Sequence, residues 1–371
     1  MEKLRYLVLE DGKVFEGKAF GSDNFTIGEL VSNSSMTGYQ EILSDNSYVG
    51  KIINLTYPMI GSYGITREGF ENTNPYIFGL IVGEYTQVPS NWKSEMTLDE
   101  YLKLKNIPAI EGIDTRMLSK IINKNHCIKA TFTDSIENVE EIVKELKEYK
   151  SDENYTDLVS IKKPFRIPNN GEKIVVIDLG ASDLVVRELN FRGKDITIVP
   201  YNFTSEEIMR IHPKGIVISN GPGNLKQLNQ LIESVKRMIG KLPIFGIGLG
   251  HQVIALASGA DIKLLDKAQR GSNYPVKNIE NNHIENVVKN NHLTVDEKSL
   301  ENTGLEITHI DVNVGNIEGL KDDSKMINSI QYQPYYIANE KVDSAFEKFY
   351  NNINELMKEE CLENSEGEIN A

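Results

Sequence analysis

The second half of the chain alternates short apolar runs with amphipathic segments. The runs Lys173–Asp178 (KIVVID) and 243–247 (PIFGI) are largely apolar on both faces, as strands buried inside a sheet are. The segments 184–191 and 225–239 have the apolar spacing of helices. Because strands that alternate with helices form a mostly parallel sheet covered on both faces, this half predicts an open α/β domain. The same patterns predict strands at 195–199, 215–219 and 329–333, helices at 251–258 and 342–358, and a hairpin of 305–311 with 315–320.

The first half has a different pattern, which begins with strands. Two β-like runs, 6–10 and 13–20, are separated by the turn Asp11-Gly12. These runs and the helical patterns that follow them predict a separate domain of mixed α/β structure. The predicted helices are Leu98–Leu104, Thr115–Lys124 and 137–150.

A change in composition marks the boundary between the halves. Residues 151–172 hold two prolines, an Asn-Asn pair and Gly171, which interrupt helix and strand patterns alike. At 371 residues the chain is also longer than one typical domain of about 150 residues. We therefore predict domains at 1–150 and 173–360, joined by a linker at 151–172 and followed by an acidic tail at 361–371.

Composition narrows the kinds of partner. A net charge of -14 without a Lys/Arg cluster argues against nucleic acid, and we interpret the acidity as a solvated surface. The most apolar stretch, 242–260, is broken by Pro243 and several glycines, so a buried strand and helix explain it better than a membrane span. Two cysteines, Cys127 and Cys361, are too few for a disulfide framework, and the start of the chain lacks a secretory pattern. These features predict a cytoplasmic protein, and we expect no metal site.

Two glycine-rich loops follow predicted strands, where the sites of open α/β domains lie. The first is Ser219-Asn220-Gly221-Pro222-Gly223, before a helix that Asn224 can cap. Its backbone N–H groups could face an anion or a developing oxyanion. A plain strand-to-helix turn explains this motif equally well, so both interpretations stay open on the motif alone.

The second loop, 245–252 (FGIGLGHQ), has the form of a nucleophile elbow. Glycines stand two residues before and two residues after the central position, where an active enzyme has Ser or Cys. The central residue here is Gly248, which has no side chain. The spacing does not fit a dinucleotide-binding fingerprint, whose third glycine would fall on His251.

These loops resemble class I glutamine amidotransferases, and several N-terminal phrases resemble the small subunit of carbamoyl phosphate synthetase in particular. The resemblance extends from about Leu7 to Tyr350. It implies a C-terminal amidotransferase domain, with helices on both faces of its sheet, and an N-terminal small-subunit domain of mixed α/β structure. The phrases that carry it are FGIGLGHQVIALASGA and SNGPG in the second half, and residues 31–64 (VSNSSMTGYQEILSDNSYVGKIINLTYPMIGSYG), PSNW (89–92) and GIDTR (112–116) in the first.

The chain departs from this family at the catalytic triad. The family has Cys at the elbow and His and Glu in a late Q-Y-H-P-E motif, whereas these positions hold Gly248, Gln333 and Tyr335 here. Without a thiolate no glutamyl thioester forms, and a glutamine side chain cannot transfer protons. A neutral tyrosine cannot orient an imidazolium as a carboxylate does. We predict that no triad residue is intact, and that His251 caps or packs at the start of its helix.

The resemblance implies a partly retained glutamine pocket. The family's N-H-G-aromatic loop is altered here, because Leu293-Thr294 follows Asn291-His292. We therefore expect glutamine to be at most a weak ligand. By resemblance, the residues that would hold it are Ser47, Gly221, Gly223, Leu249, Gln252 and Asn291.

The family's small subunit hydrolyses glutamine and passes ammonia to a large subunit, which makes carbamoyl phosphate for arginine and pyrimidine synthesis. The resemblance therefore implies a heterodimer with such a large subunit, on which ATP and bicarbonate bind, and no cofactor in this chain. The lost triad predicts a pseudoenzyme, a non-catalytic partner in ammonia-dependent synthesis. Two alternatives stay open, namely a regulatory or ligand-sensing protein and an ordinary glutamine-hydrolysing small chain.

Overall fold

The computed structural model describes residues 3–72, 74–125, 127–150, 154–334 and 344–369, without the side chains of 344–345 and 359–369. The chain forms two compact units. The first comprises Met1–Tyr155 with Asp266–Ser272, and the second comprises Thr156–Leu265 with Asn273–Ala371. The predicted linker of residues 151–172 is therefore divided between the units, and a segment of the second half belongs to the first unit.

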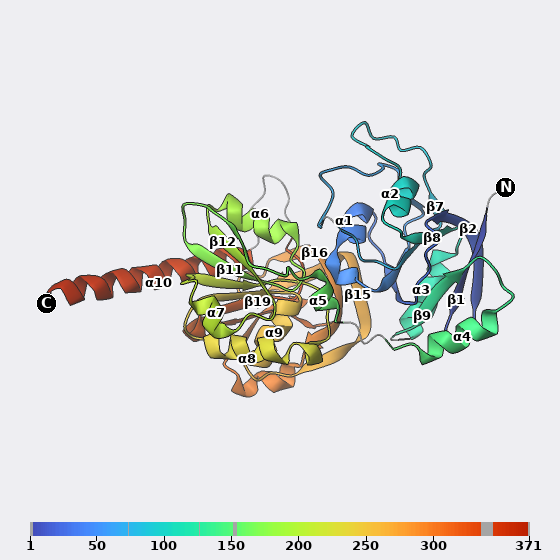
Figure 1. Ribbon diagram of the computed structural model, residues 1–371. Helices are drawn as coiled ribbons and strands as arrows, with labels where there is room; N and C mark the ends of the chain where they lie inside the picture. Colours follow the sequence, from blue (N-terminus) through green and yellow to red (C-terminus); the bar gives the residue numbers. More distant parts are fainter. Residues whose placement is uncertain (1–2, 73, 126, 151–153, 335–343, 370–371) are drawn as a thin grey trace. The chain divides into compact units, whose positions relative to one another are not determined.

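The first unit is built on a closed barrel of seven strands, in the order β1-β2-β8-β6-β4-β3-β9. Figure 1 labels β1, β2, β8 and β9 of this barrel. Its hairpin β1–β2 turns at Asp11-Gly12 as predicted, and Gly12 has the positive φ of 86° that favours glycine. Closure of the barrel was not predicted, because it needs β1 to pair with β9, far away in the sequence. The strands are β1 (Leu4–Leu9), β2 (Val14–Gly21), β3 (Gly28–Asn33), β4 (Lys51–Leu55), β6 (Gly79–Ile81), β8 (Pro108–Glu111) and β9 (Lys129–Thr133).

Helices and short strands surround this barrel. Two helices, α2 (Leu98–Leu104) and α3 (Thr115–Lys124), have the predicted bounds. Thr97 and Glu100 form a capping box at the start of α2, which explains where that helix begins. The other elements are α1 (Tyr39–Ser44), η1 (Asn46–Tyr48), α4 (Val139–Glu148), β5 (Met59–Ile60) and β7 (Glu84–Tyr85).

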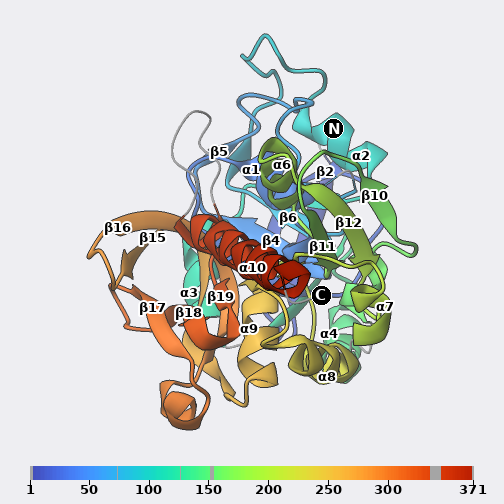
Figure 2. The ribbon, with the colours of Figure 1, turned by 90° about the vertical axis from the view of Figure 1, so that its left-hand side faces the viewer.

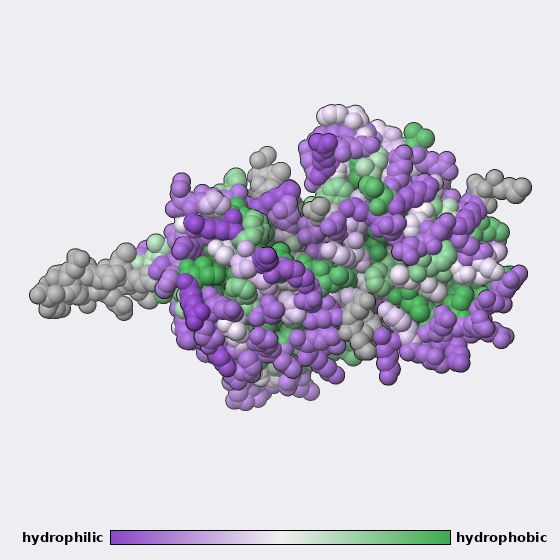
Figure 3. Space-filling view, viewed as in Figure 1, coloured by the Kyte–Doolittle hydropathy of each residue, from purple (hydrophilic) through white to green (hydrophobic). Residues whose placement is uncertain are grey.

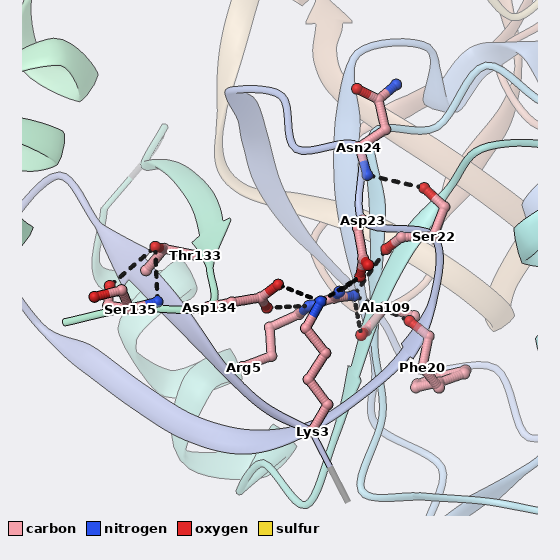
Figure 4. A network of polar contacts seen from close by, with 10 residues as sticks. All are labelled: Lys3, Arg5, Phe20, Ser22, Asp23, Asn24, Ala109, Thr133, Asp134 and Ser135. Atoms are coloured by element: carbon pink, nitrogen blue, oxygen red, sulfur yellow. Dashed lines mark hydrogen bonds and ion pairs between the residues drawn. The ribbon is translucent and has the colours of Figure 1, made fainter.

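A buried arginine forms hydrogen bonds to several strands of the barrel (Figure 4). Arg5 on β1 is fully buried, and its Nε donates to Asp134 Oδ1 at 3.1 Å, just after β9. Its Nη1 donates to the carbonyl oxygens of Phe20 on β2 and Ala109 on β8. Because these bonds satisfy a buried charge and join four parts of the barrel, Arg5 stabilises the closed form.

The second unit contains a ten-stranded sheet in the order β10-β12-β11-β13-β14-β19-β18-β17-β15-β16. Strands β12, β11, β13, β14 and β19 are parallel neighbours, whereas β18, β17 and β15 continue the sheet antiparallel. The bounds are β10 (Phe165–Ile167), β11 (Lys173–Asp178), β12 (Asp195–Pro200), β13 (Gly215–Ile218), β14 (Ile244–Ile247), β15 (Ile262–Asn278), β16 (Ile284–Val295), β17 (Glu306–Asp311), β18 (Ile317–Asp322) and β19 (Ile327–Ile330).

Helices cover both faces of this sheet, as predicted (Figure 2). Alternate residues of β11 point to opposite faces, so Val175 packs in one core with helices α8 and α9, while Val176 packs in another with α6 and α10. The helices are α5 (Tyr155–Val159), α6 (Asp183–Phe191), α7 (Ser205–Met209), α8 (Asn229–Met238), α9 (Leu249–Ala257) and α10 (Ser344–Ile369), with the 3-10 turns η2 (Leu225–Gln227), η3 (Glu297–Asn302) and η4 (Asp323–Lys325).

Several expectations differ from the structure. The predicted linker contains α5 and β10, and β10 lies at the sheet edge, where its flanking prolines remove no needed hydrogen bond. Helix α10 extends into the predicted tail at 361–371 and ends at Ile369. Neither β15 nor β16 was predicted, because polar residues recur along both and no long apolar run marks them.

The visible surface is mostly hydrophilic, in agreement with the high net charge of the chain. Hydrophilic residues cover most of the face in Figure 3, with apolar residues in small patches between them. Within the described residues, no helix has the length and apolar character needed to cross a membrane. The same residues contain no group of three or more His, Cys, Asp or Glu side chains arranged to hold a metal ion.

Candidate functional site

The elbow joins β14 to α9 through Gly248, as the sequence predicted. Gly248 has φ 56° and ψ −108°, a combination that is strained for a residue with a side chain but open to glycine. Its N–H donates to the carbonyl oxygen of Ile330, 2.8 Å away at the end of β19. The strand-turn-helix geometry of a nucleophile elbow is therefore present, although its central residue is glycine.

The two flanking glycines of the elbow are required by close packing. A Cβ atom on Gly250 would lie 2.2 Å from the carbonyl oxygen of Ile218, and one on Gly246 would lie 2.7 Å from the carbonyl oxygen of Gly250. A Cβ atom on Gly248 would instead be 3.3 Å from Asn220 Cβ and farther from everything else. The fold thus excludes side chains on both flanks, whereas a side chain at the centre would need Asn220 to shift by a few tenths of an ångström.

The glycine loop, residues 219–223, lies beside the elbow, because Asn220 is the nearest neighbour of that added Cβ. Ser219 Oγ accepts a hydrogen bond from Leu179 N at 2.9 Å and donates to the carbonyl oxygen of Asn220 at 2.8 Å. An added Cβ on Gly221 would lie 1.8 Å from the carbonyl oxygen of Leu179. The loop therefore packs against Leu179, the residue that follows β11. Gly221 permits that close approach because it has no side chain.

Asn224 caps the short turn η2, accepting from Lys226 N at 3.1 Å. The helix predicted at 225–239 is two elements, η2 and α8, with Leu228 between them at φ −102° and ψ 14°.

The late motif follows β19, the strand parallel to β14. Gln331 N donates to the carbonyl oxygen of Glu318, and Gln333 N donates to that of Val288 at 3.0 Å. Gln333 therefore forms an isolated bridge to β16, so the strand predicted at 329–333 ends earlier than expected. Tyr335 lies outside the described residues.

Two of the six glutamine-binding positions expected by resemblance stand in the first turn of α9. Leu249 follows the elbow directly, and Gln252 is buried with its Nε2 donating to Gln331 Oε1 at 3.0 Å. Gly221 and Gly223 lie in the glycine loop next to them. The structure therefore brings four of the expected positions together at the carboxyl ends of β13 and β14.

The other two positions lie on elements elsewhere in the chain. Asn291 lies on β16, which contacts α9, and its buried Oδ1 has no hydrogen-bond partner among the described residues. Ser47 lies in η1 of the first unit, where its N–H donates to Asp45 Oδ1 at 2.8 Å.

The two histidines of the site loops occupy opposite environments. His251 is fully buried, and its Nδ1 is hydrogen-bonded with Ser329 Oγ at 2.9 Å. Burial, together with nearby His309, lowers the pKa of His251 to about 3, so its ring is neutral at pH 7. The ring packs in the core and forms no side-chain cap, while His292 is exposed on β16.

Sequence reasoning missed a buried charge cluster formed by Lys289, Asp311 and Glu318. Lys289 Nζ lies 2.5 Å from Asp311 Oδ2 and 2.7 Å from Glu318 Oε1, and all three side chains are buried. Burial raises the pKa of Glu318 to about 7, although Lys289 opposes that shift. The two acids stood on the predicted hairpin, but only a correct prediction of β16 would have placed Lys289 opposite them.

Family models match both parts of the chain. "Carbamoyl-phosphate synthase small chain, CPSase domain" matches residues 7–132, and "Glutamine amidotransferase class-I" matches residues 175–353. These matches agree with the resemblance found in the glycine loops and the N-terminal phrases.

Curated relatives match over nearly the whole length. The "Carbamoyl phosphate synthase pyrimidine-specific small chain" of Bacillus subtilis (strain 168) is 46% identical over 356 residues, which are 96% of this chain and 97% of that protein. The protein of the same name from Halalkalibacterium halodurans is 46% identical over 89% of this chain and 91% of its own length. The "Carbamoyl phosphate synthase small chain" of Staphylococcus saprophyticus is 41% identical over 98% of this chain and 100% of its own. Because identities of 41–46% extend over most of the length of these proteins and of this chain, the chain belongs to the carbamoyl phosphate synthase small chain family.

Proposed function

We propose that this chain is a non-catalytic small subunit, which docks on a large carbamoyl phosphate synthase subunit without hydrolysing glutamine. The single observation that carries the proposal is Gly248 at the centre of an otherwise intact elbow. Covalent hydrolysis of an amide needs a nucleophilic atom at that point, and glycine offers none. The complex would then draw on free ammonia.

The positions expected to assist the nucleophile support the same conclusion. Gln333 cannot act as a general base, and Tyr335 carries no negative charge at pH 7 with which to orient one. His251 is no substitute, since its ring is buried and held by Ser329. The members of such a triad act as a unit, so the loss of the nucleophile alone removes about as much activity as the loss of all three.

The proposed partner follows from family membership across both units. ATP and bicarbonate would bind to the large subunit, and this chain would supply no cofactor. The names of two relatives include "pyrimidine-specific", which favours the pyrimidine branch over the arginine branch as the use of the product.

An ordinary glutamine-hydrolysing small chain is the main alternative. Identity of 46% over nearly the full length favours it, as does the retained strand-turn-helix backbone of the elbow. A ligand-sensing role is the second alternative, favoured by the unpartnered, buried Oδ1 of Asn291 within the described residues.

The deciding experiment is reconstitution with the large subunit from the same organism. We expect carbamoyl phosphate formation with ammonium and none above background with glutamine, and no release of glutamate. A family small chain with cysteine at the elbow serves as the positive control for glutamine use. Glutamine-dependent synthesis that survives repurification would contradict the proposal and establish the hydrolysing alternative.

A further inference from the structure

Helix α5 lies in the segment that composition marked as a linker, yet its first buried side chain contacts the glycine loop. Thr156 is fully buried, and its Oγ1 donates to the carbonyl oxygen of Pro222 at 2.7 Å. A Cβ atom on Gly223 would lie 2.4 Å from Thr156 Oγ1 and 3.4 Å from Leu249 Cδ2. The loop therefore runs between Thr156 on one side and the start of α9 on the other.

The end of α5 is itself fastened to the sheet. Ile161 N donates to Asp178 Oδ2 at 2.7 Å, at the carboxyl end of β11. Ser160 Oγ accepts from Tyr201 N at 3.3 Å, directly after β12. Because two strand ends hold this segment, Thr156 has a defined position from which to act on the loop.

The bond to Pro222 has a geometric consequence for Gly223. The peptide unit between them is planar and trans, as are the peptide bonds of the described residues in general, so its C=O and N–H point in opposite directions. Holding the carbonyl oxygen therefore fixes the direction of Gly223 N–H. Gly223 itself has φ 149°, a conformation that glycine adopts more readily than other residues because it has no Cβ atom.

We propose that Thr156 is a positioning residue, which sets the direction of Gly223 N–H in the glycine loop through its bond to the Pro222 carbonyl. The role concerns the shape of the loop and does not require glutamine to be hydrolysed. Its test is therefore separate from the test of the proposed function.

Hydrogen–deuterium exchange of the full chain, followed by mass spectrometry of peptides covering 219–224, tests this role. Thr156→Val removes the donor and keeps the size, and we expect exchange in 219–224 to become about fivefold faster, as loss of one hydrogen bond implies. Thr156→Ser keeps the donor and should exchange like the wild type. Peptides from β11 should be unchanged in both variants.

Thr303→Val is a matched control, because buried Thr303 also donates its hydroxyl to a carbonyl, that of Leu300 at 2.9 Å, in a different part of the unit. It should leave exchange in 219–224 unchanged. Thr156→Ala is the second variant in case valine crowds Gly223 and the protein fails to fold. Wild-type exchange in 219–224 for both donor-less variants, or equal acceleration by Thr303→Val, would overturn the proposal.

Discussion

The backbone has the shape of a nucleophile elbow, but its central residue, Gly248, has no side chain that could act as a nucleophile. Its φ of 56° is a conformation in which a side chain costs about 1–3 kcal/mol, and glycine avoids that cost. An added Cβ at this position would lie 3.3 Å from Asn220 Cβ, a less severe contact than those at Gly246 and Gly250. We therefore expect the elbow to accept a side chain at position 248 at a modest cost in stability.

Gly248→Cys alone should not create glutaminase activity. The thiol would keep a pKa near its usual value, because the expected position of the base holds Gln333, and it would be mostly protonated at pH 7. Adding Gln333→His and Tyr335→Glu supplies a base and its orienting carboxylate, and we expect weak glutamate release from that triple variant. Glutamate release and thermal unfolding of both variants are the measurements.

Gly250→Ala is the matched control for the cost of the substitution. Its Cβ would collide with the backbone of Ile218, so it should lower the melting temperature more than Gly248→Cys does. Robust hydrolysis by the single cysteine variant would show that a working base already stands beside Gly248.

At the scale of elements, the buried charge cluster joins β16, β17 and β18. Lys289 is the central member, since it pairs with both Asp311 and Glu318. The backbone of Glu318 also accepts from Gln331 N, so the cluster adjoins the strand that leads into the late motif. Removing one member of such a buried cluster leaves an uncompensated charge.

Lys289→Met should destabilise the protein by about 3–5 kcal/mol at pH 8 and by less at pH 5. With Lys289 present, the pKa of Glu318 in the folded chain is already raised to about 7, and loss of the cation raises it further. When the pKa of a carboxyl group is higher in the folded than in the unfolded chain, the folded protein becomes less stable as pH rises from about 4.5 through the folded pKa. Denaturant unfolding of variant and wild type at both pH values measures the difference.

Two controls separate this effect from general damage. Lys298→Met changes an exposed lysine and should have little effect at either pH. Lys289→Met with Glu318→Gln removes the second carboxylate and should recover part of the stability at pH 8. An equal loss at pH 5 and pH 8 for Lys289→Met would show that Glu318 does not titrate as described.

At the scale of the whole molecule, similarity to the small chain family extends over both units. The relatives match 96% of the chain in the case of Bacillus subtilis, so the N-terminal barrel and the amidotransferase-type unit are retained together. This joint retention is expected if both units are needed for assembly, and it is the basis for the prediction about the partner.

The chain should form a stable complex with the large subunit of the same organism, through its first unit and one face of its second. Interfaces of this permanent kind commonly bury more than about 2,000 Å² and persist at micromolar concentration. Size-exclusion chromatography with light scattering should give a mass equal to the sum of the two chains. Gly248→Cys should assemble equally well, and separate elution of the two wild-type chains would contradict the prediction.

Much of the fold was predictable from local pattern. The strand Lys173–Asp178 and the helices Leu98–Leu104 and Thr115–Lys124 have the bounds that periodicity indicated. The elbow was predictable because its signal, glycines at fixed spacing after an apolar run, lies within a few residues. The composition of the 151–172 segment was misleading, since prolines that interrupt a pattern also fit an edge strand.

The sequence by itself determined the class of both domains, the elbow and the absence of a side chain at Gly248, because each depends on neighbouring residues. The tertiary structure alone decided the closure of the barrel, the pairing of Lys289 with two acids and the contact of Thr156 with the glycine loop. The physical reason is that these features join residues far apart in the chain. Their partners are selected by strand pairing and burial, which local hydrophobic pattern does not specify.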